Sequence, residues 1–245
     1  MTSGARALVW PGVATAVLFG LLMSLGLWQV RRLGEKEALI ARVESRAHLA
    51  PAEAPSRDKW ASLAPLDYDF SHVTAKGRYL ADRDALIFMK PPEGFGLEPG
   101  YLVVGPFELA SGGEILVERG FVPLSRMKDV AGRAPPTGEI EITGLMRAPQ
   151  SRNMFTPGDT PQLRIWYTRE PASIAATLGL AGAAPFTIAL EAPASPGPNG
   201  YPRLVPVAPE FPNNHFTYAL TWFSLAAALL VVFGLFARAR LAQER

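Results

Sequence analysis

Histidine is the residue type through which metal or acid–base chemistry could enter this sequence of 245 residues. The chain has three histidines, His48, His72 and His215, and no cysteine. The lack of cysteine excludes disulfide scaffolds, thiol nucleophiles, cysteine-type zinc sites and iron–sulfur clusters. We expect His48 to be exposed beside Arg46, and His72 to be a surface or core imidazole with satisfied hydrogen bonds. His215 is therefore the histidine whose position needs an explanation.

His215 lies where a polar segment meets a long apolar run. An ionisable side chain is costly there unless it has a partner or a ligand. On a helix, His215 would share one face with Tyr218 and Trp222, and that face could pack against Trp28 and Gln29. Two interpretations stay open. His215 is either an interfacial anchor or an axial ligand to a membrane-embedded macrocycle, because imidazole is a common haem ligand and aromatic walls suit a porphyrin.

Two further groups of residues have types that could bind a ligand or a partner. Asp67 and Asp69 would share one face of a strand edge, which could suit a cation, although a solvated strand edge is the favoured interpretation. Gly120 follows an alternating strand, so it permits a bulge or a close approach of the backbone, and Arg119 beside it could form a bidentate pair. The Arg119–Gly120 pair is either a partner contact or a structural ion pair at a strand end.

Enzymatic and nucleic-acid-binding signatures are missing from the sequence. It contains no Walker loop, no G-x-G-x-x-G motif after a strand, no G-x-S-x-G elbow and no H-E-x-x-H motif. The glycine-rich run 94–100 is interrupted by Pro99 and precedes no helix, which favours a turn between strands. The net charge is only +2, and no stripe of basic and aromatic residues accumulates. We therefore expect neither an enzyme nor a nucleic-acid-binding protein; a membrane-anchored hydrolase would need a catalytic constellation that the sequence lacks.

Two uncharged apolar runs, 8–30 and 216–237, bracket the segment that contains these residues. Each is long enough to cross a hydrocarbon core of about 30 Å as a helix. A cleaved signal peptide is the alternative for the first run, but that run is longer than a typical signal-peptide core. Two spans place the tails 1–7 and 238–245 on one side of the membrane and residues 31–215 on the other.

Basic residues in the tails set the predicted orientation. Arg6, Arg238, Arg240 and Arg245 favour cytoplasmic tails, whereas the long middle segment crosses largely regardless of its charge. The simplest setting is a bacterial inner membrane with the middle segment in the periplasm.

The middle segment changes from a helical to a strand pattern. Helical spacing continues from the first span over residues 31–46, and from residue 68 the apolar period becomes two. Seven strands are predicted, at 73–79, 85–89, 101–107, 114–121, 139–146, 163–167 and 186–190. One helix is predicted at 172–180, with Pro171 at its start and Gly179 near its end. The predicted fold is thus two transmembrane helices bracketing an antiparallel β-rich extramembrane domain, sandwich or barrel-like and of the α+β class.

Three segments carry a resemblance to a known family: residues 25–33 (LGLWQVRRL), 115–123 (ILVERGFVP) and 213–223 (NNHFTYALTWF). In this order, between two spans, they resemble the surfeit locus protein one family of cytochrome c oxidase assembly factors. The sequence departs from the family's usual pattern at Phe121, where tryptophan is usual, and at Glu35, where an aromatic residue is common.

The resemblance implies a non-enzymatic factor that binds haem a and helps it reach subunit I of an aa3-type cytochrome c oxidase. It further implies that His215 ligates the haem iron. Trp28, Tyr218 and Trp222 would then be candidate pocket walls.

The same resemblance suggests further groups and partners. Arg31, Arg32 and Arg203 could pair with haem propionates, although a surface role is the alternative for each. The haem a synthesis machinery and membrane lipid are further expected partners. A chaperone that stabilises subunit I without binding haem is the alternative function.

Overall fold

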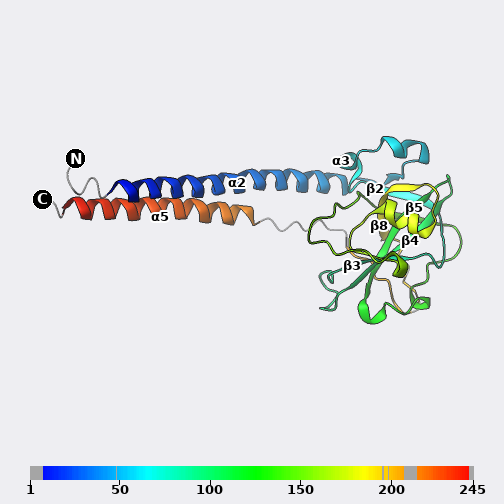
Figure 1. Cartoon of the computed structure of the whole chain (residues 1–245). Helices are drawn as coiled ribbons and strands as arrows, with labels where there is room; N and C mark the ends of the chain where they lie inside the picture. Colours follow the sequence, from blue (N-terminus) through cyan, green and yellow to red (C-terminus); the bar gives the residue numbers. More distant parts are fainter. Residues whose placement is uncertain (1–7, 48, 195, 198, 207–213, 243–245) are drawn as a thin grey trace. The chain divides into compact units, whose positions relative to one another are not determined.

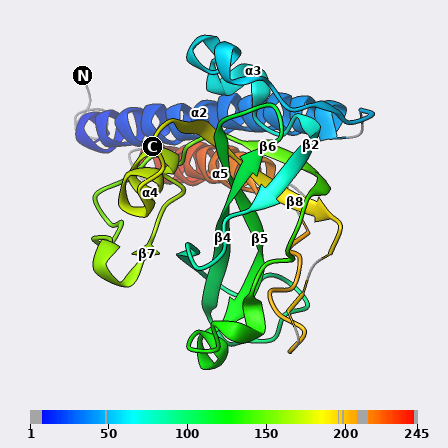
Figure 2. The same cartoon turned by 90° about the vertical axis from the view of Figure 1, so that its right-hand side faces the viewer.

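The computed structural model describes residues 8–47, 49–194, 196–197, 199–206 and 214–242. His48, the tail 1–7 and residues 243–245 of the second tail lie outside the described residues. The chain divides into two units (Figures 1 and 2). The helical unit comprises Met1–Arg42 and Pro209–Arg245, and the sheet domain comprises Val43–Ala208.

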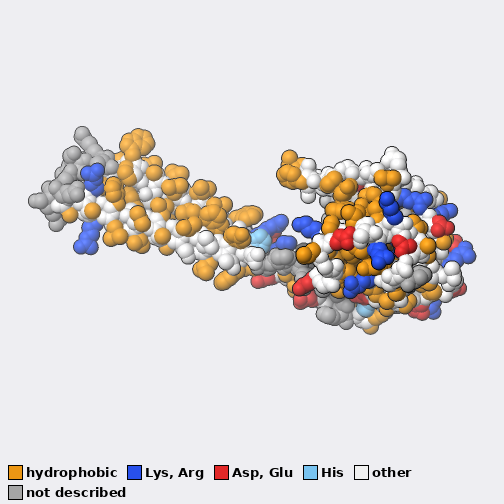
Figure 3. All heavy atoms as spheres, turned by 90° about the horizontal axis from the view of Figure 1, so that it is seen from below, with side chains coloured by type: hydrophobic (Ala, Val, Ile, Leu, Met, Phe, Trp, Pro, Cys, Tyr) orange, Lys and Arg blue, Asp and Glu red, His pale blue; other side chains and the backbone are white. Residues whose placement is uncertain are grey.

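The helical unit contains the two helices that the apolar runs predict. Helix α2 spans Val9–Ala47, so the first span does continue as a helix, and α5 spans His215–Ala242. The segments Val9–Ala38 and His215–Ala242 are long and apolar enough to cross a membrane. Hydrophobic side chains dominate the face of this unit seen in Figure 3, and Lys and Arg side chains gather near its ends. This distribution is typical of membrane-spanning helices.

Helices α2 and α5 pack as an antiparallel pair through small residues. A Cβ atom added to Gly12 would lie 3.5 Å from the Phe233 ring, and one added to Gly26 would lie 2.4 Å from the Phe223 ring. Gly12, near the start of α2, faces Phe233 late in α5, whereas Gly26, further along α2, faces Phe223 earlier in α5. The two helices therefore run in opposite directions. Glycine at position 26 lets the helix backbone approach the aromatic ring closely, as small residues do between membrane helices.

The sheet domain is built on one sheet of eight strands, which includes all seven predicted strands. The strands are β1 (Ala52–Glu53), β2 (His72–Tyr79), β3 (Ala85–Met89), β4 (Gly100–Leu109), β5 (Glu114–Pro123), β6 (Ile140–Arg147), β7 (Ile165–Trp166) and β8 (Ala183–Ala192). Their order is β1-β2-β6-β8-β5-β4-β3-β7, and β2 also pairs with β4. This last pairing closes β2, β6, β8, β5 and β4 into a ring, which confirms a barrel-like arrangement.

Most strand pairs are antiparallel, as predicted, but three are parallel. These are β1 with β2, β3 with β7 and β5 with β8. The parallel pairing of β5 with β8 requires a long crossover between them, and helix α4 (Pro171–Leu178) lies in that crossover. Pro171 occupies its first turn and Gly179 ends it in the left-handed conformation at φ 68°, which confirms the predicted helix.

Alternation along the strands sorts their side chains among separate hydrophobic clusters. In β5, Ile115 and Val117 belong to one cluster with Phe186, whereas Leu116 belongs to a second cluster with Trp166. Successive side chains point to opposite faces, so a strand covered on both faces reads as a continuous apolar run. Strands β4 and β5, which run side by side in Figure 2, are buried over nearly their whole lengths for this reason.

The connections include four 3-10 helices and one short α-helix among the described residues. They are η1 (Arg57–Ser62), α3 (Pro65–Tyr68), η2 (Leu124–Arg126), η3 (Ala131–Arg133) and η4 (Pro161–Leu163). The glycine-rich run 94–100 links β3 to β4, with Gly94 and Gly96 at positive φ, as the prediction of a turn requires. The strand predicted at 186–190 is longer at both ends, because β8 begins at Ala183 and still includes Glu191 and Ala192.

The prediction that Asp67 and Asp69 share a strand edge is wrong. Asp67 lies in α3, which Pro65 starts, and Asp69 follows the end of that helix. The fixed φ of proline favours a first helical turn here and overrides the alternating pattern read from residue 68 onward. Asp69 Oδ1 instead accepts a hydrogen bond of 2.9 Å from the backbone N–H of Ala148. No cluster of three or more metal-ligating side chains occurs among the described residues.

Candidate functional site

The candidate site of the helical unit is centred on His215, the first residue of α5. Its Nδ1 lies 2.6 Å from Oε1 of Gln29 on α2. An amide oxygen only accepts hydrogen bonds, so Nδ1 carries the proton and donates it to Gln29. In the neutral imidazole, the other ring nitrogen, Nε2, then bears the lone pair. This is the tautomer that can bind a metal through Nε2, held by the kind of partner that orients metal-binding histidines.

Gln29 is well placed to hold the imidazole. Its side chain is 9% exposed, and it is the one buried polar residue among those whose burial the structure describes in the two helices. A buried amide needs hydrogen-bond partners, and His215 supplies one. The sequence predicted that the His215 face would meet Trp28 and Gln29, and the structure brings both to it.

The aromatic residues of the site differ in their relation to His215. The Trp28 ring meets the imidazole edge to face, with ring centroids 6.4 Å apart and an angle of 88° between their planes. Tyr218 and Trp222 follow at helical spacing, with Tyr218 exposed and Trp222 partly buried. Apolar and aromatic surface beside a lone-pair nitrogen suits a flat macrocycle bound through its metal. The role of all three aromatic residues as pocket walls stays a prediction.

The three arginines named as propionate candidates occupy different surroundings. Arg31 and Arg32 follow Gln29 on α2 and are exposed, and Arg32 Nη1 forms a 2.6 Å ion pair with Glu35 Oε2. Arg203 belongs to the sheet domain, where its guanidinium lies 4.4 Å from the centroid of the Phe95 ring. Of the three, Arg31 and Arg32 share a unit with His215, and their pairing with an anionic ligand stays a prediction.

The second region that the sequence singled out, Arg119–Gly120 on β5, forms a β-bulge. Val103 of β4 pairs with Gly120 and the next residue, Val104, pairs with Glu118, so Arg119 has no partner in the ladder. Gly120 has a φ of 133°, and a Cβ atom on it would lie 2.3 Å from the carbonyl oxygen of Arg203. Both features predicted for this glycine, a bulge and a close approach of the backbone, are confirmed.

Arg119 itself points into the protein. It is 1% exposed, and its Nη1 donates a 2.9 Å hydrogen bond to the carbonyl oxygen of Arg133. Its guanidinium also lies 5.3 Å from the centroid of the Tyr79 ring and 3.6 Å from Asp84 Oδ1. These contacts favour the structural interpretation of Arg119, and a contact with a partner protein stays a prediction.

A bidentate pair was predicted for Arg119, but the neighbouring Glu118 forms it instead, with Arg169. Glu118 accepts hydrogen bonds from Arg169 Nε and, at 3.2 Å, from Arg169 Nη2, and Thr187 Oγ1 donates a third at 2.5 Å. Burial opposes ionisation of Glu118, but the charge and hydrogen bonds of Arg169 outweigh it and lower the pKa of this carboxyl. Arg119 takes no part in this bidentate pair, because Glu118 and Arg119 point to opposite faces of the strand.

His72 has internal partners, as predicted. Its Nε2 lies 2.9 Å from Glu191 Oε2, and its Nδ1 lies 3.0 Å from the carbonyl oxygen of Leu49. It therefore offers no free ring nitrogen.

No pattern in the sequence indicated the interior charges around Asp84, Arg133 and Arg169. Their positions come from loops and strands far apart in the chain, and neither spacing nor a motif connects them.

Comparison with known proteins decides the family. The family model described as the SURF1 family matches residues 16–227, a range that contains Trp28, the Arg119–Gly120 bulge and His215. The chain belongs to the SURF1 family. The resemblance drawn from the three sequence motifs is thereby confirmed.

Relatives of this SURF1-family chain occur in eukaryotes and in bacteria. A SURF1-like protein of Monosiga brevicollis is 33% identical over 227 residues, covering 88% of this chain and 82% of the relative. Surfeit locus protein 1 of Mus musculus is 32% identical over 228 residues, covering 87% and 70%. A SURF1-like protein of Rickettsia conorii is 26% identical over 230 residues, covering 93% and 91%. The similarity therefore includes both helices and the sheet domain.

Proposed function

We propose that this protein is a non-enzymatic assembly factor for aa3-type cytochrome c oxidase, which binds haem a and assists its insertion into subunit I. Membership of the SURF1 family, whose proteins are known as cytochrome c oxidase assembly factors, supports the general role. The observation that carries the haem-binding part is the hydrogen bond from His215 Nδ1 to Gln29 Oε1. That bond leaves Nε2 as the ligating nitrogen.

The surroundings of His215 match the chemistry of haem a. The group carries a lipophilic tail, which favours apolar surroundings, and propionates, which favour cations at a polar boundary. The helical unit offers exposed apolar side chains along both helices, and Arg31 and Arg32 follow Gln29 after one intervening residue, Val30. Bound haem a would supply the iron that His215 ligates, while the protein's own residues orient the imidazole and receive the propionates.

The proposed location is a bacterial inner membrane with both tails cytoplasmic and the sheet domain periplasmic. There the factor would meet subunit I and the machinery that makes haem a. A reporter inserted at Gly112, in the exposed turn between β4 and β5, tests the orientation. A periplasmic signal is expected, and a cytoplasmic signal would overturn this orientation.

Haem content and oxidase assembly together test the proposed function. The full chain, purified from cells that make haem a, should carry haem a, and His215→Ala should lose it. His72→Ala is the matched control, because it removes a histidine that hydrogen-bonds within the sheet domain.

Cells whose only copy is His215→Ala should form less aa3-type oxidase than cells with His72→Ala. If the purified wild type carries no haem and His215→Ala supports normal assembly, the haem-ligand function is wrong. Loss of oxidase on deletion of the whole chain would then favour the chaperone that acts without haem.

A further inference from the structure

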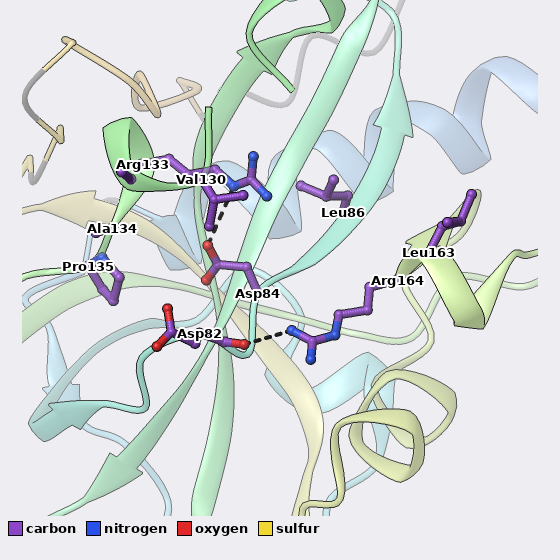
Figure 4. A pocket seen from close by; sticks show the side chains of 10 residues that line it. Asp82, Asp84, Leu86, Val130, Arg133, Ala134, Pro135, Leu163 and Arg164 are labelled. Carbon is purple, nitrogen blue, oxygen red and sulfur yellow. Dashed lines mark hydrogen bonds and ion pairs between the residues drawn. The ribbon is translucent and has the colours of Figure 1, made fainter. Parts of the chain in front are cut away.

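A cavity lies in the sheet domain, which is the unit that does not contain His215. Its volume is about 420 Å³, and three separate segments line it: residues 82–86, 130–135 and 163–164. Figure 4 shows Val130 and Arg133 on one side and Leu163 and Arg164 on the other, with Asp84 between them. A cavity of this size is typical of small-ligand sites.

Apolar side chains form much of the wall. Leu86 is buried, whereas Val130 and Leu163 are 52% and 63% exposed. Ala134 and Pro135 complete this part of the lining. Large apolar side chains that stay exposed around a hollow mark a surface suited to an apolar group of a ligand.

The charged groups at the cavity are held near one another without being fully paired. Asp84 Oδ1 lies 3.6 Å from Arg119 Nη1, and Asp84 Oδ2 lies 3.7 Å from Arg133 Nε. Both distances exceed the usual hydrogen-bond range, so each contact is electrostatic only. Within the described part of the chain, the buried Arg119 Nε, Arg119 Nη2 and Arg133 Nε accordingly have no hydrogen-bond partner.

Positive and negative groups alternate here. Arg133 and Arg164 line the cavity together with Asp82 and Asp84. Arg119 interacts with Asp84 from outside the lining, and Asp129 interacts with Arg133. Buried guanidinium N–H groups without hydrogen bonds are costly, and an anion in the cavity would reduce that cost through its charge.

The rim of the cavity holds Arg164 in a defined position. Arg164 Nη1 donates a 2.7 Å hydrogen bond to the carbonyl oxygen of Asp82 (Figure 4). Both residues have positive φ, 55° for Arg164 and 60° for Asp82. The hydrogen bond to Asp82 occupies one N–H group of the Arg164 guanidinium. The remaining N–H groups of this guanidinium bond to no other described residue.

We propose that this cavity binds a carboxylate group carried on a small apolar body. Arg164 would contact the carboxylate directly, Arg133 and the buried Arg119 would add their charges, and the apolar body would lie against Leu86 and Leu163. Such a carboxylate belongs either to a short-chain organic acid or to the C-terminal residue of a polypeptide. The proposal does not depend on haem binding by His215.

Two pairs of probes test it on the full chain in lipid nanodiscs. Butanoate is compared with butanol, and N-acetyl-leucine, which mimics a C-terminal residue, is compared with N-acetyl-leucinamide. Chemical shifts of the Leu86 and Leu163 methyl groups report binding at the cavity. We expect at least one acid to bind about tenfold or more tightly than its uncharged twin, because guanidinium–carboxylate hydrogen bonds are charge-assisted.

Variants show whether the named residues are responsible. Arg164→Gln should weaken acid binding about tenfold and leave the uncharged twins unchanged. Arg126→Gln, which removes an exposed arginine outside the cavity lining, is the matched control and should change the affinity less than about twofold. Ala134→Phe fills the cavity without removing a charge and should abolish binding, which provides a test even if Arg164→Gln does not fold.

The outcomes separate the sources and can overturn the proposal. Binding of butanoate alone indicates a small acid, and binding of N-acetyl-leucine alone indicates a polypeptide terminus. The proposal is wrong if neither acid shifts the two methyl groups up to its solubility limit, or if each acid binds no better than its twin. It is also wrong if Ala134→Phe leaves acid binding unchanged, or if Arg126→Gln weakens it as much as Arg164→Gln does.

Discussion

The sheet domain and the helical unit bury opposite kinds of side chain. In the sheet domain the largest residues are fully enclosed, with Trp166, Phe107 and Phe186 each 0% exposed. Among the described residues of the helical unit the buried apolar side chains are small, and Ala219 and Ala226 are 4% and 1% exposed. Leucine, valine and phenylalanine side chains cover the outside of the two helices instead.

This contrast follows from the different surroundings of the two units, which are water for the sheet domain and a hydrocarbon layer for the two helices. In water, burial of large apolar side chains supplies the main stabilisation. In a hydrocarbon layer, an exposed leucine costs nothing, so helices associate through close packing of small residues and through hydrogen bonds. The same chain therefore uses Phe186 as a core residue and Gly26 as a packing residue. Each can be changed separately.

The largest effect is expected from Phe186→Ala. Removal of this fully buried ring should lower the free energy of unfolding of the sheet domain by about 4 kcal/mol, measured by urea denaturation of the full chain in micelles. Leu225→Ala in α5, where the side chain is 47% exposed, should have no measurable effect on the same transition. Equal losses in the two variants would contradict the comparison.

The next largest effect is expected from Glu118→Gln. It should lower the free energy of unfolding of the sheet domain by about 3 kcal/mol, because it leaves the partly buried Arg169 charge without its partner. The pKa of Glu118 is lower in the folded protein than its ordinary value of 4.5. Its stabilisation is therefore present above pH 4.5 and is lost as the pH falls through the lower folded value. Glu108→Gln is the control, since Glu108 forms an exposed pair with Arg78 and should cost less than about 1 kcal/mol.

Unfolding midpoints measured between pH 3 and pH 7 should show a shallower acid-side decline for Glu118→Gln than for the wild type. Parallel pH profiles for the two proteins would mean that Glu118 is not the titrating group.

In the helical unit, Gly26→Leu should destabilise the packing of α2 against α5 by about 2 kcal/mol of free energy, because the new side chain meets the Phe223 ring. Gly20→Leu is the control, because a Cβ at Gly20 would meet no atom within 4 Å. The chain has no cysteine, so a cysteine pair at positions 12 and 233 can report helix proximity by bismaleimide cross-linking. The cross-linking yield should fall for Gly26→Leu alone. A similar yield for both variants would contradict this packing.

The smallest effect is expected at the end of α4. Gly179 has a φ of 68°, so Gly179→Ala should cost about 1 kcal/mol in the thermal unfolding of the sheet domain. Gly158→Ala is the control, because Gly158 has no positive φ and no atom near an added Cβ. It should leave the thermal unfolding midpoint of the sheet domain unchanged within experimental error. A loss at Gly158 as large as that at Gly179 would remove the conformational explanation.

Local patterns in the sequence predicted the elements well. The two apolar helices, the seven main strands and the helix between Pro171 and Gly179 all follow from periodicity and from the rules for helix ends. The bulge at Gly120 and the contact of His215 with Gln29 were also predictable, because each depends on a glycine or a polar residue in an unusual place.

Contacts between distant segments were not predictable in the same way. The pairing of Gly77 in β2 with Leu109 in β4 closes the ring of strands, and no local pattern specifies it. The same holds for the ion pair between Glu118 and Arg169. A strand period shows that Arg119 and Glu118 face opposite ways, but it does not show which charge each will meet.

The central claim, that His215 binds haem a through Nε2, is tested most directly by pulsed EPR of the ferric, haem a-loaded full chain labelled with 15N-histidine. The wild type and His72→Ala should show the hyperfine coupling of a directly bound histidine nitrogen, and His215→Ala should lose it. A wild-type sample without that coupling, or a His215→Ala sample that keeps it, would rule out ligation of the haem iron by His215.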